Sequence, residues 1–170
     1  MSELLAGRSP LSPADYIEAT RSLYSSLGYD PYRWAERPDT PPFTPFAKPL
    51  SDCKVALVGS GGVYRAGQIA FGTRDDTSIR VIPSDTQVTE LRTAHFAYDQ
   101  HDARRDPNVV FPLTPLAELS AAGVIGTVAA NAYAFMGGIY STRRVEQEVV
   151  PLLTEQLLAD EVDLVLLVPV

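Results

Sequence analysis

The sequence predicts an α/β protein with a Rossmann-like, mostly parallel sheet and flanking helices, preceded by an N-terminal helix and a Pro/aromatic-rich arm. Short apolar runs of strand type alternate with amphipathic helical stretches, and this alternation is typical of parallel sheets. The chain has 170 residues, of which 45% are apolar and 21% charged, as in ordinary globular domains. We expect two parts: the helix and arm in residues 1–50, and the α/β domain in residues 51–170.

The N-terminal part is predicted to hold one helix and one irregular arm. Ser12 can cap the helix, Pro13 suits its first position, and Gly28 is a typical stop. Prolines recur through residues 30–50, which excludes a helix or a central strand there. The aromatic residues mixed with these prolines predict that the arm packs on its own domain or on a neighbour. They are Tyr32, Trp34, Phe43 and Phe46.

The α/β domain is predicted to begin with an apolar strand at residues 54–59, followed by a glycine-rich turn. Alternating apolar residues predict a second strand at residues 77–83. Residues 89–95 are interpreted as a helical turn, and residues 108–111 as a short strand.

Two helices and two extended segments are predicted in the rest of the domain. Thr114 is expected to cap the first helix, and residues 131–138 to be extended. The second helix begins near Ser141 and must kink or restart at Pro151, because proline lacks an amide hydrogen. The apolar run at residues 163–170 then predicts a central parallel strand that is covered on both faces.

Charge and composition exclude several classes of function. The net charge of −7 argues against nucleic-acid binding, which needs clustered lysine and arginine. The single cysteine, Cys53, excludes a disulfide framework, and its position before a strand favours a structural role. The chain starts without a signal-peptide pattern and has no apolar run of membrane-spanning length. We therefore expect a cytoplasmic protein without membrane contact.

Ser60, Gly61 and Gly62 follow the first strand and form one candidate site. Glycines let backbone amides approach an anion, and the serine adds a hydroxyl group. The dinucleotide-binding fingerprint is not matched, because no helix with a third glycine follows in register. Two interpretations stay open: a tight structural turn, or a site for an anion or carboxylate.

The densest polar run of the chain contains both histidines, His95 and His101. His95 is followed by Asp99, and an imidazole near a carboxylate is typical of acid–base chemistry around neutral pH. The spacing of the two histidines matches no standard zinc pattern, so no metal is assigned. A solvated loop rich in turn-forming residues explains the same run equally well.

Several stretches along residues 54–170 match one family when they are taken together. They are 54–58 (KVALV), 60–63 (SGGV), 80–85 (RVIPSD), 95–99 (HFAYD), 102–112 (DARRDPNVVFP), 123–126 (GVIG), 135–138 (FMGG) and 162–170 (VDLVLLVPV). With these stretches the chain resembles the selenoprotein B family of the glycine, sarcosine, betaine and D-proline reductases. The string at residues 102–112 is the most specific, because folding does not require so polar an arrangement.

The resemblance implies an oxidoreductase subunit acting on a small amino-acid-type substrate. A selenolate or thiolate attacks the substrate, and a dithiol reduces the resulting bond. In the family, the reactive selenocysteine or cysteine directly follows the strand that matches the end of this chain, and a further α/β portion comes after it. We therefore expect that the chain stops at a UGA codon after Val170 and is inactive alone. A different stop codon would contradict this.

The resemblance gives no firm role to most of the matching residues, and the roles below are our own expectations for them. We expect His95 and Asp99 to give acid–base help at the substrate. Substrate-binding candidates are Ser60, Gly61 and Gly62 for a carboxylate, and Asp102, Asp106 and Asn108, which either line the pocket or lock the loop. A second copy or a partner subunit is expected to cover the last strand, because an apolar edge strand invites pairing. The alternatives are a non-catalytic anion-binding or assembly module, and a metal-assisted hydrolase that uses the His/Asp loop.

Overall fold

The computed structural model describes residues 13–30, 38–42, 44–45 and 48–170. By its internal contacts the chain divides into two units, residues 1–42 and residues 43–170. The first unit contains helix α1, Pro13–Ser26, which is followed by Gly28 with a φ of 82°. This left-handed glycine ends the helix as predicted. The proposed Ser12 cap and the aromatic residues of the arm lie outside the described residues.

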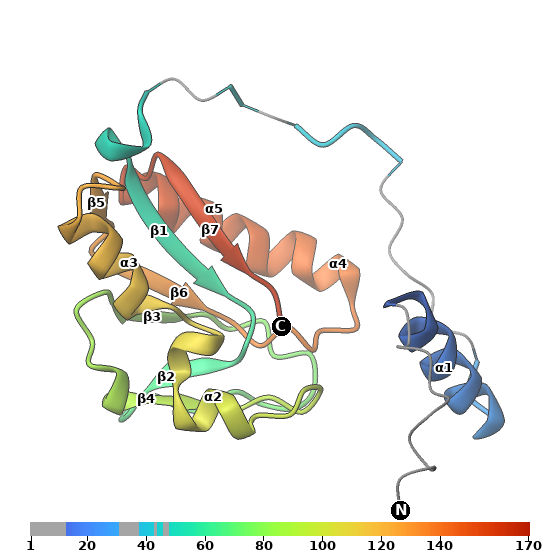
Figure 1. The fold of residues 1–170 in the computed structure, drawn as a ribbon. Coiled ribbons are helices and arrows are strands. Elements are labelled where there is room, and N and C mark those ends of the chain that lie inside the picture. Colours follow the sequence, from blue (N-terminus) through green and yellow to red (C-terminus); the bar gives the residue numbers. More distant parts are fainter. Residues whose placement is uncertain (1–12, 31–37, 43, 46–47) are drawn as a thin grey trace, which may run out of the picture. The chain divides into compact units, whose positions relative to one another are not determined.

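The second unit is built on a five-stranded, mostly parallel sheet (Figure 1). Its central strand β1 pairs in parallel with β5, β6 and β7, and β3 pairs antiparallel with β6. Val58 of β1 is paired with both Tyr133 and Leu167, so β6 and β7 flank β1 on opposite sides. The mixed α/β class is thus confirmed. The strands are β1 (Lys54–Gly59), β3 (Arg80–Pro83), β5 (Thr127–Val128), β6 (Asn131–Ala134) and β7 (Leu164–Val168).

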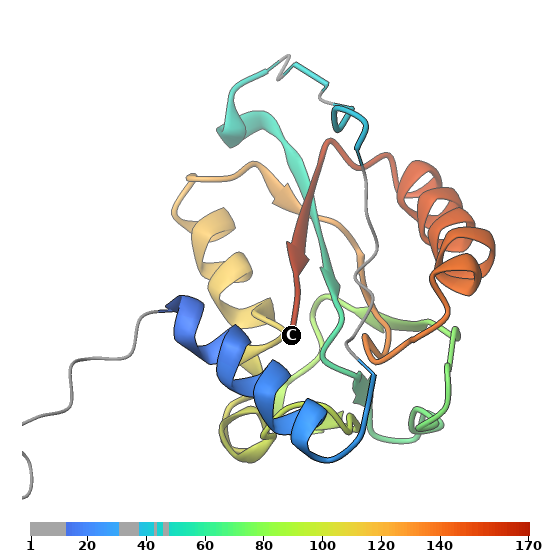
Figure 2. The same cartoon turned by 90° about the vertical axis from the view of Figure 1, so that its right-hand side faces the viewer.

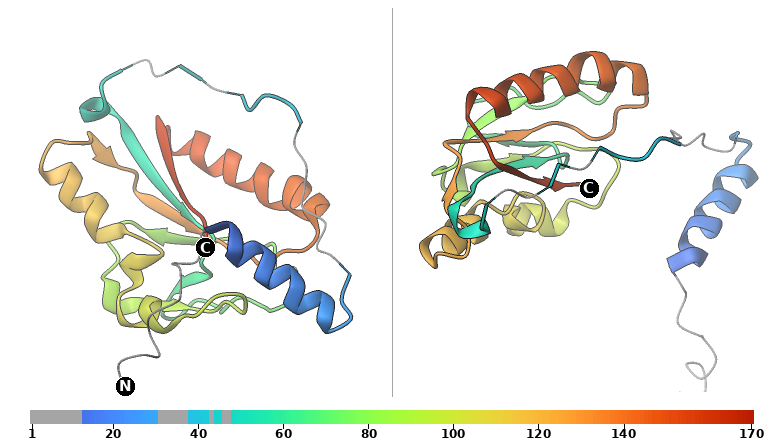
Figure 3. Two further views of the ribbon diagram at one scale, coloured as in Figure 1. Left: turned by 45° about the vertical axis from the view of Figure 1, so that its right-hand side comes forward. Right: turned by 90° about the horizontal axis from the view of Figure 1, so that it is seen from above.

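Helices lie on both faces of this sheet. Helix α3, Leu113–Ala121, is on one face, and a longer helix lies on the other (Figures 2 and 3). The longer helix has three segments: α4 (Thr142–Arg144), a π-helical turn (Val145–Val149) and α5 (Val150–Ala159). The π-helical turn directly precedes Pro151, so the predicted interruption is confirmed.

A two-stranded antiparallel sheet and several short helices complete the second unit. The sheet pairs β2 (Val63–Arg65) with β4 (Leu91–Thr93). The 3₁₀ helices are Leu50–Asp52, Val88–Glu90 and Pro107–Val109, and α2 spans His101–Arg105. Two predictions are therefore wrong. Residues 91–93 form a strand because they pair with β2, and a 3₁₀ turn replaces the strand predicted at residues 108–111.

Two further predictions are wrong: the burial of β7 and the cap of α3. Strand β7 is parallel, as expected, but it pairs only with β1 among the described residues. Leu166 and Leu167 are 39% and 68% exposed, so the strand is not covered on both faces. Thr114 does not cap α3: its N–H instead donates to the side-chain oxygen of Asn108, 3.1 Å away. An apolar run reports a tendency to be buried, and it does not reveal whether a neighbouring strand is present.

The core packs between β1, β6 and α3 and fixes where the strands end. Val55, Leu57, Phe111 and Tyr133 are nearly or fully inaccessible to solvent. Because β1, β6 and β7 are parallel, their carboxyl ends lie at one edge of the sheet, which is where open α/β sheets bind ligands. No helix among the described residues is long and apolar enough to cross a membrane.

Candidate functional site

Ser60 joins the carboxyl ends of three strands. Its N–H donates to the carbonyl oxygen of Val168 at 3.1 Å, and its hydroxyl oxygen accepts the N–H of Val170 at 2.9 Å. Its own carbonyl oxygen accepts the N–H of Gly137, which follows β6, at 2.8 Å. The turn after β1 is therefore bonded to the segments after β6 and β7, and the three strand ends form one rigid edge.

Gly62 brings this turn against the segment that carries the histidines. Its φ is 66°, and a Cβ atom there would lie 2.1 Å from the carbonyl oxygen of Ala94, so only glycine fits. Its N–H donates to the carbonyl oxygen of Phe135 at 3.0 Å, and its own carbonyl oxygen accepts the N–H of Ala94 at 2.9 Å. The amides of Ser60 and Gly62 are thus used within the protein. The Ser60 hydroxyl oxygen acts here as an acceptor, and no hydrogen bond donated by this hydroxyl is seen among the described residues.

The ring of His95 contacts two aromatic rings, and one of its nitrogens is unpaired. Its ring centroid is 5.7 Å from that of Phe96 and 4.8 Å from that of Tyr98. Nδ1 accepts the N–H of Ala97 at 3.0 Å, so the proton of the neutral ring is assigned to Nε2. Nε2 is buried without a hydrogen-bond partner. Burial also lowers the pKa of His95, which favours the neutral ring.

Tyr98 ties the histidine loop to the glycine turn. Its hydroxyl group donates to the carbonyl oxygen of Gly61 at 2.9 Å. Burial raises the pKa of Tyr98, so the group remains a hydroxyl donor at neutral pH. The sequence does not mark Tyr98 as a site residue, because a contact across 37 residues leaves no local pattern.

The segment after β6 closes the site from another side. A Cβ atom on Gly138 would lie 2.5 Å from the ring of Phe96, and one on Gly137 would lie 3.0 Å from Cβ of Ser60. The ring of Phe96 also stacks on that of Tyr140, with centroids 6.3 Å apart. The two glycines therefore allow residues 136–138 to approach both the turn and the histidine loop.

The remaining predicted residues bond mainly within their own loop. Asp99 does not bond to His95; its carboxylate accepts the N–H of His101 at 2.9 Å. Asp102 is exposed and lies 4.0 Å from Arg105. The carboxylate of Asp106 accepts the backbone N–H and the side-chain amide of Asn108, at 3.0 and 2.9 Å. Together with the hydrogen bond that the N–H of Thr114 donates to Asn108, these contacts stabilise the conformation of residues 102–112.

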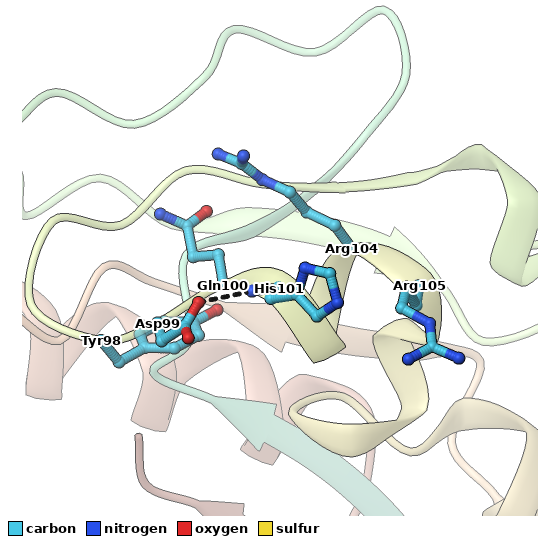
Figure 4. A pocket seen from close by; sticks show the side chains of 6 residues that line it. All are labelled: Tyr98, Asp99, Gln100, His101, Arg104 and Arg105. Carbon is cyan, nitrogen blue, oxygen red and sulfur yellow. Dashed lines mark hydrogen bonds between the residues drawn. The ribbon is translucent and has the colours of Figure 1, made fainter.

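Two cavities adjoin the histidine loop. The larger one measures about 500 Å³ and is lined by Tyr98, Asp99, Gln100, His101, Arg104 and Arg105 (Figure 4). The smaller one measures about 230 Å³ and lies between residues 71–73 and residues 93–96, with His95 in its wall. Gln100 and Arg104 line both cavities. Asp102, Asp106 and Asn108 line neither.

The site contains no thiol, and the described residues form no metal cluster. Cys53 is 1% exposed, and its sulfur lies 3.3 Å from the carbonyl oxygen of Pro49. It precedes β1, so the length of that strand, roughly 20 Å, separates it from Ser60. No group of three His, Cys, Asp or Glu residues in the described part of the chain is placed to hold a metal ion.

Comparison with known proteins assigns this architecture to one family. The model of the family "Glycine/sarcosine/betaine reductase selenoprotein B" matches residues 32–170. D-proline reductase subunit gamma of Acetoanaerobium sticklandii is 38% identical over 132 residues, which covers 76% of this chain and 54% of that protein. Glycine reductase complex component B subunit gamma of Carboxydothermus hydrogenoformans is 33% identical over 108 residues, which covers 58% of this chain and 24% of that protein.

The chain is similar to only part of each relative. It spans about half the length of the D-proline reductase subunit and smaller shares of the glycine and sarcosine reductase subunits. No solved structure matches the chain.

Proposed function

The chain belongs to the glycine/sarcosine/betaine reductase selenoprotein B family, and on that premise we propose that it forms the substrate-side scaffold of a reductase subunit. In the proposed reaction a selenolate or thiolate attacks the α-carbon of a small amino-acid-type substrate and breaks its C–N bond, so that the protonated amine leaves. A dithiol then supplies two electrons and two protons that cleave the new carbon–selenium or carbon–sulfur bond, which releases the reduced product, restores the selenol or thiol and leaves a disulfide. One observation carries the proposal: the histidine loop and the glycine turn are hydrogen-bonded at the converging carboxyl ends of β1, β6 and β7.

We propose that the nucleophile comes from outside these 170 residues. The only thiol of the chain, Cys53, is buried at the opposite end of β1. Val170, in contrast, is bonded to Ser60, and its side chain lies 3.3 Å from where a Cβ atom of Gly61 would be. A selenol or thiol carried next to Val170, by a longer chain or by a partner, would therefore reach the candidate site. The 170 residues alone are proposed to bind substrate without converting it.

Within this site, His95 is proposed to contact the substrate through Nε2. A neutral imidazole with one bonded nitrogen presents a defined hydrogen-bond donor, and local rearrangement would let it exchange a proton. Asp99 is proposed to assist by holding the turn that precedes α2. Ser60, with Gly61 and Gly62, is proposed to bind a substrate carboxylate through its hydroxyl. Asp102, Asp106 and Asn108 are proposed to position the loop.

We propose that a partner covers the exposed edge of β7. The relatives are described as subunits or components of complexes, and the outer edge of this parallel strand has no partner among the described residues. Leu166 and Leu167 expose apolar surface there. A strand from a partner subunit or a second copy would continue the sheet. The added strand would make β7 an inner strand of the sheet, as predicted from the sequence.

The proposed function is tested in a full-length form that carries the selenol or thiol. Replacing His95 with alanine should lower kcat/KM by about 100-fold, the lower end of the effect of an acid–base group. His101→Ala is the matched control, since His101 is exposed and lines only the larger cavity. Turnover unchanged by His95→Ala would remove His95 from the site. A full-length form that shows no turnover at all would favour a non-catalytic binding module.

A further inference from the structure

Three buried polar atoms without a hydrogen-bond partner belong to residues that line the smaller cavity. They are Oγ1 of Thr93, Nε2 of His95 and Oε1 of Gln100. Unpaired buried polar atoms cost free energy and are rare in native proteins. The only others among the described residues are on Ser84 and Thr86, which line neither cavity. Three of these five residues line one cavity, so a polar ligand bound there would complete their hydrogen bonds after side-chain rotations that uncover the three atoms.

The three unpaired atoms differ in what they can bind. Nε2 of His95 is a donor, because the N–H of Ala97 occupies Nδ1. Oε1 of Gln100 is an acceptor, because the nitrogen of the same amide donates to the carbonyl oxygen of His95. The Thr93 hydroxyl can donate or accept. Arg104 adds a positive charge, and its side chain projects from the same side of the loop as that of Gln100 (Figure 4).

The opposite wall of the cavity is held in place without a ligand. The N–H of Gly72 donates to the carboxylate of Asp76 at 2.7 Å. The guanidinium group of Arg80 lies 4.2 Å from the ring centroid of Phe71 and also donates to the carbonyl oxygen of Ile69 at 2.7 Å. This wall is therefore preformed, and the cavity volume of about 230 Å³ corresponds to several water molecules at about 30 Å³ each. It suits a small ligand.

We propose that this cavity binds the polar end of a small ligand that carries an oxyanion and at least one N–H group. His95, Thr93 and Arg104 bind the oxyanion in place of the Ser60 hydroxyl, because Ser60 lines neither cavity, and Oε1 of Gln100 accepts the N–H. The inference rests on the proposed function in placing His95 at the substrate, and it adds Thr93 and Gln100 as specificity-determining residues. A ligand with a fully alkylated nitrogen leaves Gln100 unpaired and therefore binds less tightly.

The family description supplies a matched series of probes: glycine, sarcosine and betaine, whose nitrogen carries three, two and no hydrogens. Each is titrated into the 170-residue chain and followed by two-dimensional ¹H–¹⁵N NMR. Glycine and sarcosine should bind about tenfold more tightly than betaine, with shifts of the amides of Thr93, His95 and Gln100. Equal affinity for all three, no binding, or shifts confined to other residues would overturn the proposal.

Two substitutions separate binding from folding. Thr93→Val removes a hydroxyl that has no partner, so the melting temperature should stay constant or rise while glycine affinity falls about tenfold. Gln100→Leu also removes the bond from the Gln100 amide to the carbonyl oxygen of His95, so its melting temperature is measured alongside, and glycine binding should weaken more than betaine binding. The controls are Thr89→Val and Gln87→Leu, two exposed positions on the same segment of chain. Unchanged glycine affinity in Thr93→Val overturns the inference.

The failure of this inference can be told apart from failure of the proposed function. If His95→Ala abolishes turnover in the full-length form while Thr93→Val binds glycine normally, only the inference fails. If glycine binding requires Thr93 and Gln100 while His95→Ala leaves turnover intact, the ligand site stands and the catalytic role proposed for His95 fails.

Discussion

The N–H of Val170 donates a 2.9 Å hydrogen bond to the hydroxyl oxygen of Ser60, 110 residues earlier in the chain. This bond closes the end of β7 against the turn that follows β1. The same turn is bonded through Gly61 to Tyr98, whose ring contacts that of His95. The end of the last strand, the glycine turn and the histidine loop are therefore one connected unit.

Removing the Ser60 hydroxyl should loosen the end of β7. Ser60→Ala leaves the N–H of Val170 without its acceptor, and we expect a loss of about 1 kcal/mol of unfolding free energy. Amide hydrogen exchange at Val168 and Val170 should become faster, while exchange in the middle of β1 stays slow. Ser51→Ala is the control, since Ser51 is exposed and its hydroxyl donates to the neighbouring Asp52 at 3.4 Å. Unchanged exchange at Val170 would show that the bond does not hold the strand end.

Gly62 should be the least replaceable glycine of the turn. Gly62→Ala places a Cβ atom 2.1 Å from a backbone oxygen in a left-handed conformation, so we expect a cost of about 3 kcal/mol or more. Gly67 is the matched control, because its φ is 95° but nothing lies within 4 Å of the added atom. Gly67→Ala should cost about 1 kcal/mol. Equal denaturant midpoints for the two variants would contradict the close approach to Ala94.

The bond from Tyr98 to Gly61 should contribute measurably to stability. Tyr98→Phe keeps the ring packed against His95 but leaves the Gly61 carbonyl oxygen without this donor. We expect a loss of about 1 kcal/mol in urea unfolding. Tyr140→Phe is the control, since Tyr140 is 69% exposed and contacts Phe96 only through its ring. A loss of the same size in both variants would assign the effect to the rings and not to the hydroxyl.

His95 should make stability depend on pH below neutrality. Burial lowers its pKa in the folded state below the ordinary value of 6.5. Above that value both states carry a neutral ring, so stability is constant; below it the unfolded state binds the proton first, and stability falls until the folded pKa is passed. Thermal melts between pH 7 and about pH 5 should show a shallower decline for His95→Gln than for the unsubstituted chain. If the decline of stability with falling pH becomes shallower in His101→Gln but not in His95→Gln, this assignment is contradicted.

The sequence was informative where local pattern determines structure. The apolar run of β1, the stop at Gly28 and the interruption before Pro151 all follow from properties of one segment. The position of β7 at the sheet edge does not, because an apolar run carries no information about its neighbours.

The sequence predicts only part of the candidate site, because a local pattern does not show which distant residues meet in the fold. His95 and Ser60 lie in recognisable polar and glycine-rich stretches. Thr93, Tyr98 and Gln100 became candidates only when folding placed them around a cavity or against Gly61. Asp106 and Asn108 are predicted either to line the pocket or to stabilise the loop, and the structure shows that they are hydrogen-bonded to each other.

The central claim is that these 170 residues build a reductase site without the nucleophile. The most direct measurement is a reductase assay of the purified chain with glycine, sarcosine and D-proline, in the presence of dithiothreitol as the dithiol. We predict that substrate consumption does not exceed that of a protein-free blank. An NMR spectrum of the same sample shows that the chain is folded. Dithiol-dependent turnover by the chain alone, abolished in Cys53→Ser, would contradict the account.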